Sequence, residues 1–283
     1  MKLGIHAYAW CSQWSNETLD LIDRVKRLGM DFIEIPLMAL DTFDAAAVRK
    51  RLNDAELDSC TSTVLLEGMD LTSHDKDERR RAVEYLKRCV EATHAIGAVN
   101  FSGVIYSQHV KPAERRPTAA ERDYAVEGFR EAAEHAKSLG VTIGVEPVNR
   151  YETYLLNTAE QAMAFVERVG LDNVGVHLDT YHMNIEEKSF GDAVRRTGSR
   201  MMHLHLCEND RGVPGSGLVD WDDLFAALRD VDYRGYAALE SFVDVTDNMN
   251  TWVWRQLAKD GDTLLTEGAA FIRSKMREYG LSA

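Results

Sequence analysis

Cysteine and proline are both scarce in this sequence, and the cysteines form no paired motif. The 283 residues include 4 Cys and 5 Pro. The cysteines are scattered along the chain, at Cys11, Cys60, Cys89 and Cys207. Without a C-x-x-C pair, this pattern excludes a zinc knuckle and a disulfide framework and predicts reduced thiols. With 45% hydrophobic and 28% charged residues, the composition also excludes collagen-like and disordered chains, so we expect an ordinary globular protein.

Positive charge is in deficit as well. Lys and Arg number 33 against 46 Asp and Glu, which gives a formal net charge of −13. A surface this negative repels phosphate backbones and anionic lipid headgroups. We therefore expect neither nucleic acid nor a membrane as a partner.

Long hydrophobic runs are missing, since nowhere do about 18 apolar residues follow one another. The opening segment MKLGIHAYAW alternates like a strand and contains neither the apolar stretch nor the cleavage site of a signal peptide. The expected location is the cytoplasm.

Strand-like segments instead alternate with helical ones along the whole chain. Short β-branched or alternating runs lie near residues 2–9, 31–37, 57–65, 99–106, 141–146, 174–179, 201–207 and 236–242. In the stretches between them, the apolar residues have the spacing of a helix. Several of these stretches end in a glycine just before the next strand, namely Gly29, Gly97, Gly140 and Gly170.

Eight such units predict a single (β/α)₈ TIM barrel that spans residues 1–283 as one catalytic domain. Parallel strands need crossover helices, eight of them can close, and no Pro- or Ser-rich linker interrupts the series. The alternative is an open doubly wound sheet. That fold usually carries a glycine-rich phosphate turn after its first strand, where this chain has AWCSQW.

Four successive strands end with an ionisable residue on the face that points into the barrel. Strand side chains alternate between the lumen and the surrounding helices, so parity identifies the inward set. In 201–207, for example, Met202 belongs to the outward set and His205 to the inward set. The four inward strand ends are Glu146, Asp179, His205 and Glu240. They lie about one strand-and-helix unit apart and should meet at the carboxyl mouth, where barrel enzymes keep their active sites.

This set predicts a metal site. Three carboxylates close together in a partly dry cavity repel one another, and a cation or protons must relieve the repulsion. Three oxygen ligands and one nitrogen, without a thiolate, suit one divalent ion, Mn²⁺ first, with Mg²⁺ or Co²⁺ as alternatives and zinc less favoured. Taken singly, each of these residues is more often a strand-end capping or salt-bridge group than a metal ligand.

The segments after these strands are polar. They carry side chains that could hydrogen-bond a polyhydroxylated ligand, namely Asn149, Arg150, Glu152, His182, Glu208 and Arg211. Gly212, Gly215 and Gly217 follow in the same loop and could cradle a phosphate, but no lysine accompanies them and the local charge is acidic.

Four segments carry a resemblance to a known family. They read VEPVNRYE (145–152), HLDTYHMNIEE (177–187), HLHLCENDRGVPGSG (203–217) and ALESF (238–242). These segments resemble the ketose 3-epimerases, the D-tagatose, D-psicose and L-ribulose 3-epimerase group of the xylose isomerase-like barrels. The similarity extends from GIHAYAW (4–10) to WVWR (252–255).

The resemblance implies roles for particular residues. Glu146, Asp179, His205 and Glu240 would bind the metal, and Glu146 and Glu240 would also be the acid/base pair. Glu152, His182 and Arg211 would hold the O1 and O2 end of the sugar. The family also implies a homo-oligomer, a dimer or a tetramer.

The chemistry of such a reaction agrees with this assignment. Inverting a carbon next to a ketone through an enediolate requires one carboxylate on each face of that carbon, and Glu146 and Glu240 belong to different strands. No organic cofactor is required. The resemblance implies a ketose of the D-tagatose, D-psicose, D-fructose or L-ribulose type. We expect it to be unphosphorylated, because the loop after the seventh strand offers a single arginine to a phosphate.

The pocket wall is less well defined. Candidates are His6, Trp14, Val64, Tyr106 and Phe242. Relatives usually have glycine near Val64, and the loop after the fourth strand lacks a tryptophan that several relatives place over the sugar, so the number of sugar carbons stays open. Glu34 has inward parity and is interpreted as a pocket-lining residue or a buried, hydrogen-bonded filler. His177 and His203 lie one layer deeper and are interpreted as supporting or core groups.

Four other functions compete with the epimerase. An aldose–ketose isomerase or a sugar or inosose dehydratase could use the same barrel and the same metal chemistry. An abasic-site endonuclease-like DNA-binding protein shares the barrel, but it would use several zinc ions and a basic surface, against which the net charge argues. A sugar-binding protein without activity would not need two opposed carboxylates.

Overall fold

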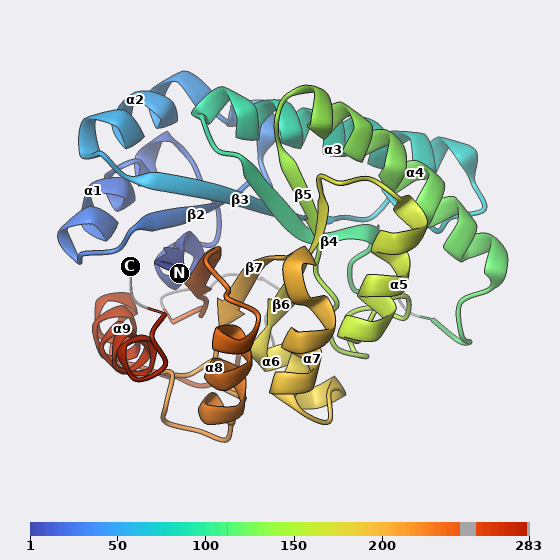
Figure 1. The fold of residues 1–283 in the computed structure, drawn as a ribbon. Helices are drawn as coiled ribbons and strands as arrows, with labels where there is room; N and C mark the ends of the chain where they lie inside the picture. The colour runs from blue at the N-terminus through green and yellow to red at the C-terminus, as the bar shows by residue number, and fades with distance from the viewer. Residues whose placement is uncertain (112, 244–252, 282–283) are drawn as a thin grey trace.

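Eight parallel strands close into a barrel in the computed structural model, which describes residues 1–111, 113–243 and 253–281 (Figure 1). The strands are β1 (Lys2–His6), β2 (Phe32–Pro36), β3 (Asp58–Leu65), β4 (Asn100–Gln108), β5 (Thr142–Val145), β6 (Val174–Asp179), β7 (Met201–Leu206) and β8 (Tyr236–Leu239). Each strand pairs with the next one along the chain, and β8 pairs with β1. The predicted TIM barrel is confirmed. Trp252, the first residue of the late WVWR segment, lies outside the described residues.

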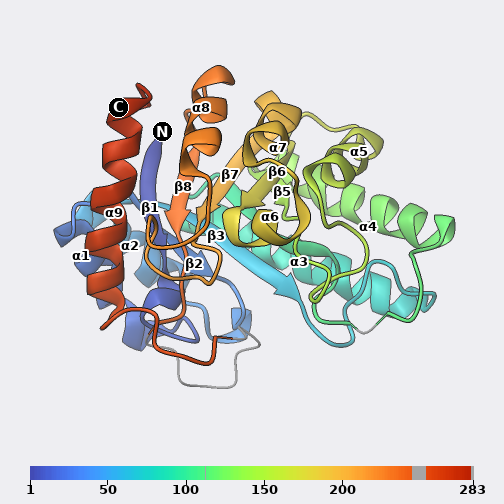
Figure 2. The ribbon, with the colours of Figure 1, turned by 90° about the horizontal axis from the view of Figure 1, so that it is seen from below.

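Helices follow the strands and surround the barrel (Figures 1 and 2). They are α1 (Asp20–Arg27), α2 (Ala45–Ala55), α3 (Lys76–Ile96), α4 (Ala119–Ser138), α5 (Ala159–Val169), α6 (Thr180–Glu186), α7 (Phe190–Thr197), α8 (Trp221–Asp230) and α9 (Gly261–Glu278). Met1 lies beside Leu281, just after α9, and its amino group donates to the Leu281 carbonyl over 3.1 Å. Within the described ranges, no helix has both the length and the apolar character needed to cross a membrane.

Local sequence signals explain where several helices begin and end. Thr158 caps α5 by accepting from the Gln161 backbone N–H, and the Gln161 side chain accepts from the Thr158 backbone in return. The helix ends at Gly170, whose φ of 74° is a left-handed conformation that glycine adopts without strain. Gly97 ends α3 in the same way. Each of these glycines ends its helix, and the chain then continues into the next strand.

The alternation of strand side chains is regular at the ends of β6 and β7 but not at the start of β7. Asp179 pairs with His205, whereas the register between the two strands shifts after Val176. An added Cβ on Gly144 would lie 2.4 Å from the Met202 Sδ, so Met202 occupies the space inside the barrel that Gly144 leaves open. The expected outward position of Met202 is therefore wrong, because the register shift reverses its parity.

Candidate active site

A cavity of about 400 Å³ opens at the carboxyl ends of the strands. Glu146 and Glu240, which directly follow β5 and β8, reach into it from the barrel. Glu152, His182 and Arg211 line it from the segments after β5, β6 and β7. Its size and its mixture of apolar wall and convergent polar groups are those of a small-molecule site.

The four predicted strand-end residues converge on one imidazole nitrogen. His205 Nδ1 lies 3.9 Å from Glu146 Oε1, 3.8 Å from Asp179 Oδ2 and 3.5 Å from Glu240 Oε1. All four side chains are buried. This convergence follows from the barrel, because β6 and β7 are in register at Asp179 and His205 and Glu240 stands at the end of the neighbouring strand.

Two buried atoms in this cluster have no hydrogen-bond partner, Asp179 Oδ2 and His205 Nδ1. Asp179 caps α6 with its other oxygen, which accepts from the Tyr181 backbone N–H over 2.7 Å. The orphaned oxygen therefore points toward His205 and the glutamates. A buried polar atom without a partner is costly unless an ion or a water molecule satisfies it.

The carboxylates of the cluster carry more negative charge than the nearby positive groups neutralise, and their pKa values show this. Burial and the neighbouring carboxylates raise the pKa of Glu146 well above its usual range, and they raise the pKa of Glu240 to about 7. Burial disfavours a charged imidazole, yet Glu34 and Glu240 raise the pKa of His205 above its usual value. Protons thus supply the positive charge that the cluster requires.

The residues present fit a divalent cation. Glu146, Asp179 and His205 each offer a ligand atom, and these three atoms lie within 4.8 Å of one another. A cation at this point would replace the protons on the cluster and satisfy both orphaned atoms. Carboxylate oxygens with one imidazole suit manganese, magnesium or cobalt.

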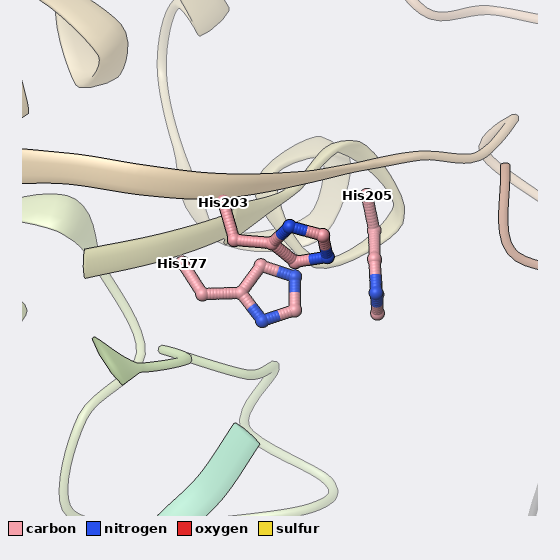
Figure 3. Close-up of side chains that lie close together, drawn as sticks. All are labelled: His177, His203 and His205. Carbon is pink, nitrogen blue, oxygen red and sulfur yellow. The ribbon is translucent and has the colours of Figure 1, made fainter. Parts of the chain in front are cut away.

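Glu34 is a residue of this site whose part the sequence did not reveal. Its Oε2 accepts from His205 Nε2 over 2.9 Å and from His203 Nε2 over 2.7 Å. The bond to Glu34 places a proton on His205 Nε2 and directs Nδ1 toward the carboxylates. Figure 3 shows the three rings of His177, His203 and His205 close to one another. The parity of Glu34 in its strand predicts that it points into the barrel. Its partners His203 and His205 lie more than 160 residues further along the sequence, so no local pattern predicts these contacts.

The three residues expected to hold substrate all line the cavity. Two of them, Glu152 and His182, are positioned by hydrogen bonds to Asn149. Glu152 accepts from Asn149 Nδ2 over 2.8 Å and pairs with His109 Nε2 at 2.8 Å. His182 Nδ1 accepts from Asn149 as well, so His182 Nε2 faces the strand ends, 3.7 Å from Asp179 Oδ2. His109 also lines the cavity, and sequence reasoning missed it because the regular alternation of β4 has ended before that position.

Arg211 reaches the cavity between two aromatic rings. Its guanidinium carbon lies 4.2 Å from the centre of the Tyr181 ring and 4.7 Å from that of Phe242. The backbone of Arg211 has a φ of 66°, a left-handed conformation that is unusual for a side chain of this size. The Ser241 hydroxyl donates to the Arg211 carbonyl over 2.7 Å and ties this turn to the end of β8. Strain of this kind often marks a functional site.

Of the five candidates for the pocket wall, Val64 and Phe242 line the cavity, and the other three do not. His6 lies within the barrel with Nε2 2.9 Å from Ser62 Oγ, and Trp14 is buried in the apolar core. Tyr106 points outward, where its hydroxyl donates to the Glu146 and Leu156 carbonyls. The pairing of β3 with β4 jumps from Val104 to Gln108, and this irregularity reverses the expected direction of Tyr106.

Two of the polar loop residues have structural partners instead of facing the cavity. Arg150 is exposed and forms a two-point ion pair with Glu186. Glu208 is fully buried and accepts from the Gly215 backbone N–H and from Trp221 Nε1, each over 2.8 Å. The glycine-rich loop after β7 is therefore organised around a carboxylate, which leaves no anion cradle there.

Comparisons with known proteins agree with this geometry. The family model for the xylose isomerase-like TIM barrel matches residues 22–275. A ketose 3-epimerase from Arthrobacter globiformis is 34% identical over 284 residues, covering 98% of this chain and 97% of its own. An L-ribulose 3-epimerase from Methylomonas sp. (strain DH-1) is 35% identical over 97% of this chain and 98% of its own. The crystal structure of a D-allulose 3-epimerase from Methylomonas sp. in complex with D-allulose has a TM-score of 0.92 at 34% identity, with 97% of each chain covered.

The closed barrel with acidic and histidine side chains at its mouth is that of the xylose isomerase-like TIM barrels. Within that class the chain belongs to the ketose 3-epimerase family, whose members are carbohydrate isomerases. The resemblance seen in the sequence is thereby confirmed.

Proposed function

We propose that this protein catalyses the reversible, metal-dependent epimerisation of a free ketose at C3. The observation that carries the proposal is the convergence of two cavity-lining glutamates on His205 Nδ1, one from the end of β5 and one from the end of β8. Relatives of this chain are D-psicose and L-ribulose 3-epimerases, and one is seen with D-allulose. We assign ketoses of this type, including D-tagatose and D-fructose, as the substrates.

Glu146 and Glu240 act as the acid/base pair. One carboxylate removes the proton from C3, the electron pair of that C–H bond moves into an enediolate, and the other glutamate delivers a proton to the opposite face. The reverse reaction exchanges these roles. Both glutamates line the cavity, so each can exchange a proton with a sugar bound there.

Glu146, Asp179, His205 and Glu240 would hold one divalent ion, Mn²⁺ before Mg²⁺ or Co²⁺. Such an ion supplies Lewis-acid stabilisation of the negative charge that develops on the sugar oxygens. Glu152, His182 and Arg211 bind the O1 and O2 end of the sugar and orient C3 between the two glutamates.

The substrate carries no phosphate. Among the described residues that line the cavity, Arg211 is the one lysine or arginine. It faces an acidic mouth, and the orphaned buried atoms there would attract cations, not anions. A phosphate group would need at least one further firm cationic partner.

The direct test is to incubate the manganese-loaded protein with D-allulose, D-fructose, D-tagatose and L-ribulose and to identify the products by chromatography. Formation of the C3 epimer from at least one of them supports the proposal. An aldose product would identify an isomerase, loss of water a dehydratase, and cleavage of abasic DNA an endonuclease. Each of these outcomes, without an epimer, contradicts the proposal.

Loss of the Arg211 side chain should impair substrate binding but not metal binding. We expect Arg211→Ala to lower kcat/KM by about 10- to 100-fold, because one hydrogen bond from a charged group contributes about 1.5–3 kcal/mol. Metal content should match that of the wild type in elemental analysis. Arg168→Ala, which removes an exposed arginine paired with Asp123, is the control. Loss of metal from Arg211→Ala would overturn this division of roles.

Glu34 should act on metal affinity through His205. Glu34→Gln is expected to weaken manganese binding by about 10- to 100-fold, because a neutral amide oxygen holds the proton on His205 Nε2 less firmly than a carboxylate does. Chelator competition measures the affinity, and saturating manganese should restore most of kcat. Glu121→Gln changes a buried glutamate at the start of α4 and serves as control. Unchanged affinity in Glu34→Gln would show that Glu34 only fills the barrel.

In the metal-free protein, the contribution of Glu240 to stability should fall as pH rises. The folded-state pKa of Glu240 is about 7, above its ordinary value, so the folded state holds a proton that the unfolded state releases. This contribution to stability is complete below pH 4 and is lost as pH rises through 7. We therefore expect manganese to raise Tm more at pH 8 than at pH 5. Calorimetry at both pH values, with Glu240→Gln for comparison, checks this; an equal rise at the two pH values would contradict it.

A further inference from the structure

A thiol stands beside two of the converging carboxylates. Cys207 directly follows β7, and its Sγ lies 3.9 Å from Glu240 Oε2. The Cys207 Sγ, one Asp179 oxygen and one Glu240 oxygen all lie within 4.8 Å of one another. This trio shares Asp179 and Glu240 with the proposed manganese ligands. Its third member is the sulfur of Cys207, in place of Glu146 and His205.

The position of Cys207 is fixed by its backbone. Its N–H donates to Thr180 Oγ1 over 2.8 Å, and the Thr180 hydroxyl donates to the Cys207 carbonyl over 2.6 Å. The Sγ donates to the Glu240 carbonyl at 3.1 Å. The thiol is fully buried, yet it borders Glu240, which lines the cavity.

A second observation points to a cation at Asp179, the residue that this trio shares with the proposed manganese ligands. Asp179 is 1% exposed, and its Oδ2 has no hydrogen-bond partner. One thiolate and two carboxylates suit a thiophilic divalent ion, such as zinc or cadmium, better than manganese or magnesium. Sulfur and oxygen ligands at about 2.3 Å and 2.1 Å from a tetrahedral ion stand roughly 3.6 Å apart. The observed separation of 3.9 Å between Sγ and Oε2 needs only a small adjustment.

We propose that Cys207, Asp179 and Glu240 form a binding site for a thiophilic divalent cation, and that its occupation inactivates the enzyme. The thiol gives its proton to solvent as the sulfur–metal bond forms. Because Asp179 and Glu240 serve both sites, the thiophilic ion and the catalytic ion exclude each other. The bound ion also removes Glu240 from proton transfer, and this part of the inference rests on the proposed function.

The binding part is tested without any activity assay. Metal-free protein is titrated with cadmium chloride, and the ultraviolet charge-transfer band of a cadmium–thiolate bond is recorded. The band is expected in the wild type and in Cys11→Ser, which removes the half-buried thiol elsewhere in the chain, and not in Cys207→Ser. Circular dichroism confirms that each variant is folded. A band of full intensity in Cys207→Ser, or none in the wild type, overturns the site.

The inactivation part compares cadmium inhibition of the manganese-loaded variants. Relative to its own uninhibited rate, Cys207→Ser should need at least about tenfold more cadmium for half inhibition than the wild type or Cys11→Ser, since a lost metal contact weakens affinity by that order. Equal sensitivity contradicts the inactivation. If the wild type shows the charge-transfer band but epimerises no ketose, the proposed function fails and the cation site stands.

Discussion

Asp179→Asn is expected to lose metal and activity together. Asp179 Oδ2 is buried, has no hydrogen-bond partner, and lies 3.8 Å from His205 Nδ1 at the centre of the cluster. The neutral amide removes one negative charge and turns one of the two oxygens into a hydrogen-bond donor. Manganese affinity should fall by about 1,000-fold or more, because a buried ligand is lost outright and the remaining carboxylates keep their protons.

Isothermal titration with manganese and the epimerase rate are measured on the same samples. Asp172→Asn, an exposed aspartate paired with Lys137 ahead of β6, is the matched control and should behave as wild type. Retention of stoichiometric, tightly bound manganese by Asp179→Asn would show that the ligand set is wrong.

Glu146→Gln is expected to stop proton exchange. Removal of a general acid/base group costs about 100- to 10,000-fold in rate, and the glutamine cannot take or return a proton at C3. Metal affinity should also fall, because Glu146 is assigned as a ligand. The decisive comparison is therefore kcat at saturating manganese, with metal occupancy verified in the assay.

Glu152→Gln is the matched comparison for that experiment. Glu152 is a buried glutamate of the same cavity, but its side-chain hydrogen-bond partners are Asn149 and His109, not the four strand-end residues. Its substitution should raise KM more than it lowers kcat. If Glu146→Gln retained more than about a tenth of the wild-type kcat when fully loaded, Glu146 would not be a member of the acid/base pair.

The barrel and the four strand-end residues were predictable because both depend on regular, local patterns. Alternation fixes which side chains point inward, and a barrel forces equivalent positions of successive strands to the same mouth. Asp179 and His205 met as expected because the strands that carry them are in register at that point. The same rule gave the wrong direction for Tyr106 and Met202, since the strand pairing shifts just before those positions.

Features that depend on distant partners or on loop conformation were not predictable. Glu34 could be placed inside the barrel from its parity, but its bonds to His203 and His205 cross the barrel between strands far apart in the sequence. Glu208 looked like a candidate for substrate binding, and only the turn from Gly215 to Trp221 shows that its carboxylate holds the loop. The conformation of a loop depends on tertiary contacts, and the periodicity of hydrophobic residues in the sequence does not predict these contacts.

The measurement that tests the central claim most directly is solvent isotope incorporation during turnover. The manganese-loaded protein is incubated with D-allulose in deuterated water, and the sugars are examined by nuclear magnetic resonance. Proton exchange between Glu146 and Glu240 predicts deuterium at C3 of the epimer and none at C1. Deuterium at C1 accompanied by an aldose, or an epimer that forms without any deuterium at C3, would contradict the account.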